Sequence, residues 1–187
     1  RHKSRLRRLA IRAELTSDAM DASQLSRAQR HTVRLAAITA LREEVGTFDT
    51  RVGQLCQTLR AQQPLLIHDA TEPYYLVPFG TNRYAQAAVI LSANDGRFKE
   101  ASWSEAGQAY PPISRREAVQ AVRVRLQQFG LFRRARFQQQ WQPRNIHVQL
   151  IHQPGKSPYQ PVWEVRVFGL LFHVDQQGAV QGPIRKR

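Results

Sequence analysis

The sequence predicts an α+β protein with two tandem units, each a helix packed on an antiparallel sheet, preceded by an N-terminal helical arm. Residues 161–182 alternate apolar and polar side chains on both sides of Phe168-Gly169, which is typical of a hairpin. Residues 113–130 carry the start and stop signals of an amphipathic helix, and residues 46–106 repeat this order of elements. We therefore expect an arm at 1–45, a first unit at 46–106, a second unit at 111–183 and a basic tail at 184–187.

The charge of the chain is strongly basic and unevenly spread. Its 187 residues have a formal net charge of +14, and the excess lies in residues 1–45, 113–145 and the tail. Such patches favour anionic partners: nucleic acid, anionic lipid or an acidic protein face. No apolar run approaches the roughly 18 residues of a membrane-spanning helix. The sequence starts at Arg1 rather than Met, as a piece of a longer precursor would, so we expect any targeting segment to precede it.

The arm is expected to hold two helices. In residues 1–15 a thin apolar stripe is surrounded by Arg5, Arg7, Arg8 and Arg12, which predicts either an arm for anionic surfaces or a helix packed on its own domain or a partner. Packing is the favoured interpretation because the stripe has no aromatic anchor. Residues 23–45 place apolar side chains three and four positions apart, which fits self-association or one face buried on the following sheet. This second stripe is Leu25, Ala28, Thr32, Leu35, Ile38, Leu41 and Val45.

In the first unit we expect a helix that ends before Pro64, followed by four strands. The strands are expected at 65–67, 73–80, 85–92 and 97–103, with a linker at 107–112. Pro78 predicts an edge or a strand end, because proline lacks the amide that a central strand needs. The apolar run at 85–92 predicts a central strand.

The second unit has the clearest signals. Ser114 and Glu117 form a capping box, the buried stripe is Ala118, Val119, Val122 and Leu126, and Phe129-Gly130 ends the helix. Strands are expected at 146–152 and on both sides of Phe168-Gly169, followed by a turn at 175–178 and a short strand. Residues 73–77 match 161–165, and 93–98 match 175–180, which indicates an internal repeat.

Residues 113–182 resemble the PepSY family. The likeness is carried by Ile113-Ser114-Arg115-Arg116-Glu117-Ala118, by Trp163-Glu164-Val165 and by Val174-Asp175-Gln176-Gln177-Gly178-Ala179-Val180. The first copy matches less well, since Ala93 stands where the family has Asp. The resemblance implies a cystatin-like fold, an extracytoplasmic or membrane-attached bacterial protein, and a role in inhibiting or regulating peptidases or in binding protein. It implies no catalytic residues, and it has no counterpart for the Arg-rich segment 131–144.

That Arg-rich segment is the predicted partner-binding region. Together with Phe129 just before it, its aromatic and cationic side chains interleave: Phe132, Arg133, Arg134, Arg136, Phe137, Trp141 and Arg144. Aromatic and arginine side chains serve as anchors at protein interfaces, and they also stack on bases and bind phosphates. An ordinary helix end with buried aromatics and solvated arginines is the third interpretation.

No set of residues predicts catalysis, a cofactor or a metal site. Cys56 lacks the surroundings of a nucleophile, and His68-Asp69 has no nucleophile turn to serve. His147 and His152 lie five positions apart and so point to opposite faces of one strand. His152 and His173 could meet across a sheet as metal ligands, but two ordinary surface histidines are the favoured interpretation.

The sequence therefore predicts a non-enzymatic protein-binding module. Two roles follow from the resemblance: a peptidase-regulating segment, or a structural subunit of a larger extracytoplasmic assembly. The alternative is an Arg-rich binder of nucleic acid or of an anionic lipid surface, which the basic clusters favour.

Overall fold

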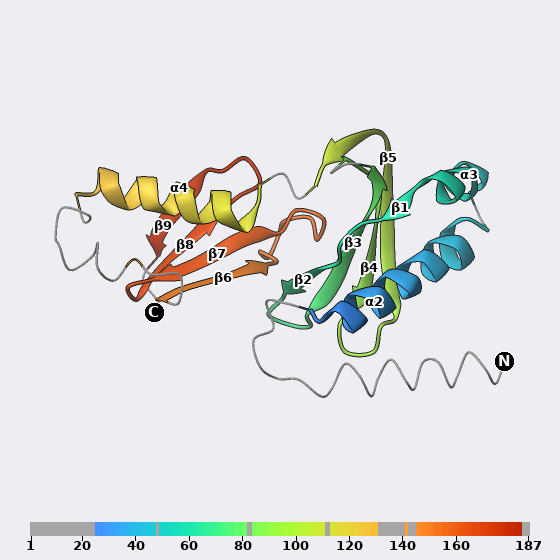
Figure 1. Ribbon diagram of the computed structural model, residues 1–187, viewed down its shortest axis with the longest axis horizontal. Coiled ribbons are helices and arrows are strands. Elements are labelled where there is room, and N and C mark those ends of the chain that lie inside the picture. The colour runs from blue at the N-terminus through green and yellow to red at the C-terminus, as the bar shows by residue number, and fades with distance from the viewer. Residues whose placement is uncertain are drawn as a thin grey trace. The chain divides into compact units, whose positions relative to one another are not determined.

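The computed structural model describes residues 25–47, 49–81, 84–110, 113–130, 141 and 145–184, apart from the side chains at 55, 56, 105, 108 and 109. It confirms the α+β class, with many strands and few helices (Figure 1). The chain divides into two compact units, Arg1–Tyr110 and Pro111–Arg187. Each unit has its own antiparallel strand pairs and its own apolar core.

The first unit is a curved antiparallel sheet with α2 on one face. β1 and β2 follow one another along one side of β3, and β4 and then β5 continue the sheet on the other side. The elements are α2 (Arg27–Ala40), the π-helical turn η1 (Leu41–Val45), α3 (Thr50–Thr58), β1 (Arg60–Ala61), β2 (Leu65–His68), β3 (Tyr74–Thr81), β4 (Tyr84–Ser92) and β5 (Phe98–Ala109).

Helix α2 is part of the first core, as expected if residues 23–45 bury one face on the following sheet, so the predicted boundary of the first unit after residue 45 falls too late. It begins after Ser26, whose hydroxyl accepts from the Gln29 amide (3.1 Å) while the Gln29 side chain accepts from the Ser26 amide (2.8 Å). Val33 and Ala37 are buried against the sheet. Leu35, which was predicted to lie on the buried stripe, is 51% exposed. Of the predicted stripe, Leu41 is buried and Leu25, Ile38 and Val45 pack against the core. Leu35 lies outside because, within α2, the side chains buried against the sheet are Val33, Ala37 and Ala40.

Pro78 lies inside the sheet, so the predicted edge position is wrong. It pairs with Ala88 of β4, and its carbonyl accepts from the Gln62 amide on the other side (2.8 Å). The nitrogen and carbonyl of one strand residue point to the same side. The missing N–H of Pro78 therefore faces the interval between β1 and β2, where no ladder partner is needed.

Strand β5 is longer than predicted, because it continues to Ala109 through the residues that were expected to open a linker. Its register against β4 shifts between Ala85 and Ala87, which leaves extra residues on β5. Gly107, with a φ of 60°, lies in this irregular part. A bulge in an edge strand lets the strand continue while it bends away from regular pairing.

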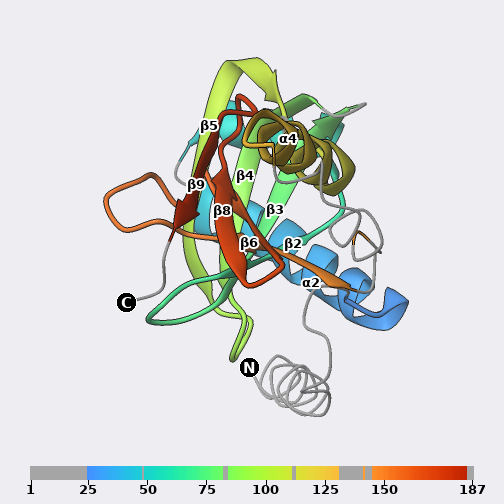
Figure 2. The same cartoon turned by 90° about the vertical axis from the view of Figure 1, so that its left-hand side faces the viewer.

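The second unit is an antiparallel sheet in the order β6-β7-β8-β9, with α4 on one face (Figures 1 and 2). The predicted capping box is confirmed: the Ser114 hydroxyl accepts from the Glu117 amide (3.3 Å), and the Glu117 carboxylate accepts from the Ser114 amide (2.6 Å). Ala118, Val122 and Leu126 are fully buried against the sheet. The elements are α4 (Arg115–Gln128), β6 (Ile146–Ile151), β7 (Val162–Val167), β8 (Leu170–Val174) and β9 (Val180–Ile184).

The turn between β7 and β8 confirms the predicted hairpin. Phe168 and Gly169 have φ values of 56° and 73°, which is the backbone of a two-residue type I′ turn. Trp163, Val165 and Val167 point toward α4, as their alternation predicted. Glu164 and Arg166 lie on the face of the sheet away from the helix, which we call the helix-free face of the second unit.

Candidate functional site

Aromatic side chains gather at one end of the second unit. Phe129, the C-cap residue of α4, is 49% exposed, and the guanidinium carbon of Arg125 lies 4.8 Å above its ring centre. The Trp141 ring lies 5.9 Å from the Phe168 ring, with the two planes tilted by 49°. Both of these rings also pack against the second core. We call this set, Arg125, Phe129, Trp141 and Phe168, the aromatic end.

The direction of α4 brings these residues to the same end. The Trp163 indole donates to the carbonyl of Ile113 just before the helix (3.2 Å), so α4 starts near the first residues of β7. The helix then runs alongside β7, so its last turn and the β7–β8 hairpin lie at the same end of the unit (Figure 1). A type I′ turn projects Phe168 there, where Trp141 meets it.

Of the predicted partner-binding residues, the structure places only Trp141. Phe132, Arg133, Arg134, Arg136, Phe137 and Arg144 lie outside the described residues, as do the arm residues Arg5, Arg7, Arg8 and Arg12. Trp141 is half-buried and packs inside the unit. Phe129 was among the aromatic side chains expected to interleave with arginines, whereas the contribution of Arg125 was missed; its signal is the spacing of four positions to Phe129 on one helix face.

A polar row crosses the helix-free face of the second unit, and sequence reasoning did not find it. Strand register aligns Gln149, Glu164, His173 and Gln181 from β6 to β9. The Glu164 carboxylate is almost fully buried and accepts from Gln149 (2.9 Å) and from Arg166 (2.6 Å). Its other oxygen lies 3.7 Å from Nε2 of His173. The alternation within each strand predicts which face of the sheet each of these residues lies on. Only the pairing register between the strands makes them neighbours.

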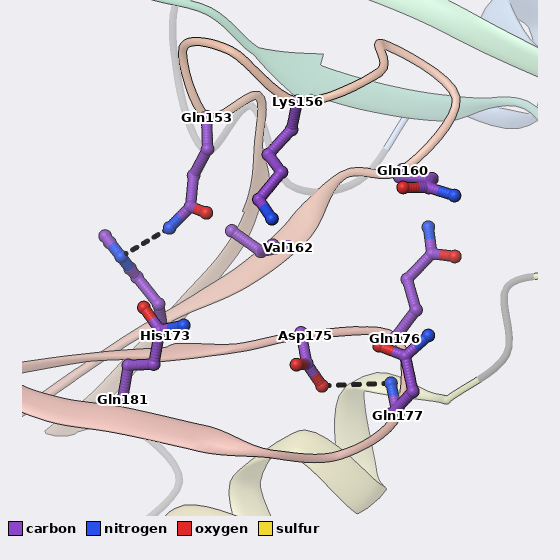
Figure 3. Close-up of a pocket in the computed structure, with 9 residues that line it drawn as sticks. All are labelled: Gln153, Lys156, Gln160, Val162, His173, Asp175, Gln176, Gln177 and Gln181. Atoms are coloured by element: carbon purple, nitrogen blue, oxygen red, sulfur yellow. Dashed lines mark hydrogen bonds between the residues drawn. The ribbon is translucent and has the colours of Figure 1, made fainter.

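The loop between β6 and β7 folds over this row (Figure 3). The Gln153 amide donates to Nδ1 of His173 (2.8 Å), and the His152 ring bonds the carbonyl of Lys156 (2.9 Å). Between the loop and the sheet is an open hollow of about 90 Å³. Its lining is mostly carboxamide: Gln153, Lys156, Gln160, Val162, His173, Asp175, Gln176, Gln177 and Gln181.

This hollow fits a polar group rather than a cofactor. Small-molecule pockets usually enclose about 300–1,000 Å³ and have mainly apolar walls. Carboxamides donate and accept hydrogen bonds but do not exchange protons near neutral pH. The carboxylate of Asp175 is already engaged, because one oxygen accepts from the amides of Gln177 (2.9 Å) and Ala179 (2.8 Å). The hollow can hold one polar side chain or a few waters.

The titratable groups with shifted pKa lie in the first unit and are structural. Burial raises the pKa of Tyr74, Tyr75 and Tyr110, so these phenols stay protonated at neutral pH. The pKa of Glu72 is lowered, first by the hydrogen bond from Lys99 (2.6 Å) and then by that from Ser92 (2.6 Å). These bonds join the loop before β3 to the β4–β5 hairpin.

The structure also shows the positions of Asp69 and Cys56, which the sequence suggested as candidates for catalysis. Asp69 closes a local turn, because it accepts from the amide and hydroxyl of Thr71 (2.8 and 2.6 Å). Cys56 falls in α3, and its side chain is outside the described residues. In the part of the chain that the structure describes, no group of three or more His, Cys, Asp or Glu side chains has the arrangement of a metal site.

Comparison with known proteins adds no relative: no family model, no curated protein and no solved structure matches this chain. Among the described residues, no helix combines the length and apolar character needed to cross a bilayer.

Proposed function

We propose that this chain is a non-enzymatic protein-binding module built from two tandem PepSY-like, cystatin-like units. In support, each unit places one long helix on an antiparallel meander. The stretches that match in sequence fall at equivalent positions: 73–77 overlap the start of β3 and 161–165 the start of β7. The turns at 93–98 and 175–180 join the last two strands of each unit. The longer β5 and the additional α3 distinguish the first unit.

The aromatic end carries the proposal. Phe129 exposes half of its surface, and Arg125 holds the ring in a cation–π contact before any partner arrives. Aromatic and arginine side chains dominate the energetics of protein interfaces, because they bury a large area with few rotatable bonds to fix. The predicted partner-binding residues Phe132 to Arg144, which include Trp141, follow Phe129 closely in the sequence.

The role of the module follows from the resemblance of residues 113–182. We propose that the partner is a peptidase that the module regulates, or a neighbouring subunit of an extracytoplasmic assembly. The two roles differ in a measurable way, since a regulator changes the hydrolysis rate of its peptidase and a structural subunit does not.

Site-specific crosslinking tests the surface. A photoreactive amino acid at Phe129 is expected to crosslink the partner, whereas the same group at Val124 is not. Val124 is 42% exposed and lies on the opposite side of α4, between the buried Val122 and Leu126. The captured protein is identified by mass spectrometry, and a peptidase encoded beside this chain is the first candidate. Equal crosslinking from both positions, or none from either, would contradict the proposal.

Matched variants give the energetic test with the identified partner. Phe129→Ser is expected to weaken binding by about 30-fold or more, because hot-spot side chains contribute about 2 kcal/mol or more. Val124→Ser is the control and is expected to leave the Kd within about twofold. Isothermal titration calorimetry measures both, and circular dichroism checks that each variant stays folded. A Phe129→Ser variant that binds as well as the unchanged chain would refute the aromatic end as the contact surface.

A further inference from the structure

The exposed side of α2 carries positive charge with no counter-charge of its own. Three arginines and one histidine lie within the helix, which has no acidic residue. In the part of the chain that the structure describes, Arg27, Arg30 and Arg34 form no ion pair. Leu35, 51% exposed, lies among them. We call Arg27, Arg30, His31, Arg34 and Leu35 the α2 basic stripe.

Arg27, His31, Arg34 and Leu35 are exposed along the helix, and Arg30, three positions before the buried Val33, is half-buried at the edge of this surface. Arg27, His31 and Arg34 are separated by four and three positions, so they share a face, and Arg27 and Arg34 lie about 10 Å apart along the axis. The apolar side of α2, with Val33 and Ala37, is already buried in the first core. The α2 basic stripe is therefore a row of cations with one aliphatic side chain, available to solvent or to a partner.

These cations do not help the helix that carries them. Arg27 and Arg30 lie in the first turns of α2, where the amide groups already give the helix end a partial positive charge. Neighbouring cations on one helix face also repel one another. Among the described residues, these side chains form no ion pair that would stabilise the helix, and their mutual repulsion destabilises it. Residues at binding surfaces often lower local stability in this way.

We propose that the α2 basic stripe is a docking surface for an anionic lipid bilayer. Arginine guanidinium groups bind lipid phosphates through paired hydrogen bonds, and basic side chains near an anionic membrane add to one another. Leu35 favours a bilayer over nucleic acid as the partner. Its exposed apolar surface is buried when it enters the interfacial region of a bilayer, whereas a nucleic-acid backbone has no apolar surface to bury it. Single-stranded nucleic acid would require aromatic stacking platforms, and Arg27–Ala40 contains no aromatic residue.

The contact is peripheral and reversible. The buried side of α2 stays in the core, so only the arginine heads and Leu35 reach the headgroups. Because the attraction is electrostatic, it weakens as the Debye length falls from about 10 Å at 0.1 M salt to about 3 Å at 1 M. This inference is independent of the protein-binding surface, which lies on the second unit.

Vesicle binding tests the inference with the full chain. Vesicles of phosphatidylcholine with about one-third phosphatidylglycerol are expected to sediment with the protein at 0.1 M NaCl and not at 1 M, and phosphatidylcholine alone is not expected to bind. Arg27→Gln with Arg34→Gln is expected to lower the partition coefficient about 30-fold. Leu35→Ser is expected to lower it by about fivefold. Arg27→Lys with Arg34→Lys keeps the charge and is expected to retain most of the binding.

The matched control removes the same charge elsewhere. Arg115 and Arg116 are exposed at the start of α4, and changing both to Gln is expected to alter the partition coefficient by less than about threefold. An equal loss in the control and stripe variants would overturn the inference, because net charge alone would then explain binding. Absence of vesicle binding would overturn it too, as would binding of duplex DNA that depends on Arg27 and Arg34 while vesicles stay unbound.

Discussion

Single residues show two different uses of a carboxylate in this protein. Glu72 lies at the surface and holds a loop to a hairpin through Lys99 and Ser92. Glu164 is buried on the helix-free face and is neutralised by Arg166 and by the amide of Gln149. The pKa of Glu72 is lowered by its hydrogen bonds from Lys99 and Ser92, so its contribution to stability is tested by changing the pH, and the contribution of Glu164 is tested by substitution.

Glu72 is expected to make the first unit less stable in acid. Its pKa in the folded protein is lowered below the ordinary 4.5. The stability that it contributes is therefore present above about pH 4.5 and is lost as the pH falls through the folded-state pKa. Glu72→Gln should be less stable than the unchanged protein at pH 7, and the difference should shrink in acid. Urea unfolding measures this, with the exposed Glu44→Gln as control; a difference that stays constant with pH would contradict it.

Replacing Glu164 with leucine is expected to destabilise the second unit by about 1–3 kcal/mol. The leucine fills the space, but it leaves the part-buried Gln149 amide without its acceptor. Arg166 loses less, since its side chain is 45% exposed and water can replace the carboxylate. The change is read from urea unfolding followed by Trp163 fluorescence. Gln177→Leu, at the exposed turn, is the control, and equal effects of the two changes would show that the polar row does not stabilise the sheet.

At the scale of elements, the same device starts both long helices. Ser26 with Gln29 in α2, and Ser114 with Glu117 in α4, each form a reciprocal capping box. In the sheets, glycine is needed where two strands approach closely. An added Cβ at Gly80 would lie 1.8 Å from the carbonyl oxygen of Tyr84.

Removing a cap is expected to weaken only the unit that contains it. Ser114→Ala should lower the unfolding free energy of the second unit by about 1 kcal/mol, within the range of about 0.5–2 measured for such caps. Ser26→Ala should do the same to the first unit. Trp163 reports the second core and Trp103 the first, so single-tryptophan variants separate the two effects. A Ser114→Ala variant that shifts neither transition would contradict the role of this cap.

Gly80→Ala is expected to destabilise the first unit by about 1–3 kcal/mol or more, because β3 must move away from the Tyr84 carbonyl to make room. Thr81→Ala, one position on and exposed, is the control and should change the unfolding free energy by less than about 0.5 kcal/mol. Thermal and urea unfolding of the two variants give the comparison. If Gly80→Ala were as stable as the control, the close approach of β3 and β4 at this bulge would be wrong.

On the scale of the whole molecule, the chain has two apolar cores with no shared residue: one around Val77 and Val89, the other around Val165 and Phe172. The first core lies between one sheet face and α2, with Leu41 of η1 and Val52 of α3 added to it, and the second lies between α4 and one sheet face. The helix-free faces differ, because the first carries the buried Leu76 and Ile90 whereas the second carries the polar row.

Core truncations test this division. Phe172→Ala should lower the unfolding free energy of the second unit by about 3–5 kcal/mol, since Phe172 is fully buried. Leu91→Ala, 1% exposed in the first core, should lower that of the first unit by about 2–5 kcal/mol. The Trp103 and Trp163 signals, each in a single-tryptophan background, assign the loss. A Phe172→Ala variant whose Trp103 transition moves as far as its Trp163 transition would contradict two separate cores.

The sequence by itself determined the local structure of this protein. The capping box at Ser114, the type I′ turn at Phe168-Gly169 and the alternation along β7 all depend on neighbouring residues, so they could be read directly. The same is true of the α+β class, which follows from the order of helical and alternating patterns.

Only the tertiary structure decided which surfaces those elements present. Leu35 was expected in the core, but α2 buries Val33, Ala37 and Ala40 against the sheet and leaves Leu35 exposed beside the arginines. Pro78 was expected at an edge, but β1 and β2 line one side of its strand and leave room for its missing N–H. Glu164 and His173, and likewise Trp141 and Phe168, are neighbours only because strand register and the course of α4 bring distant segments together. Such contacts depend on long-range packing, which no local pattern encodes.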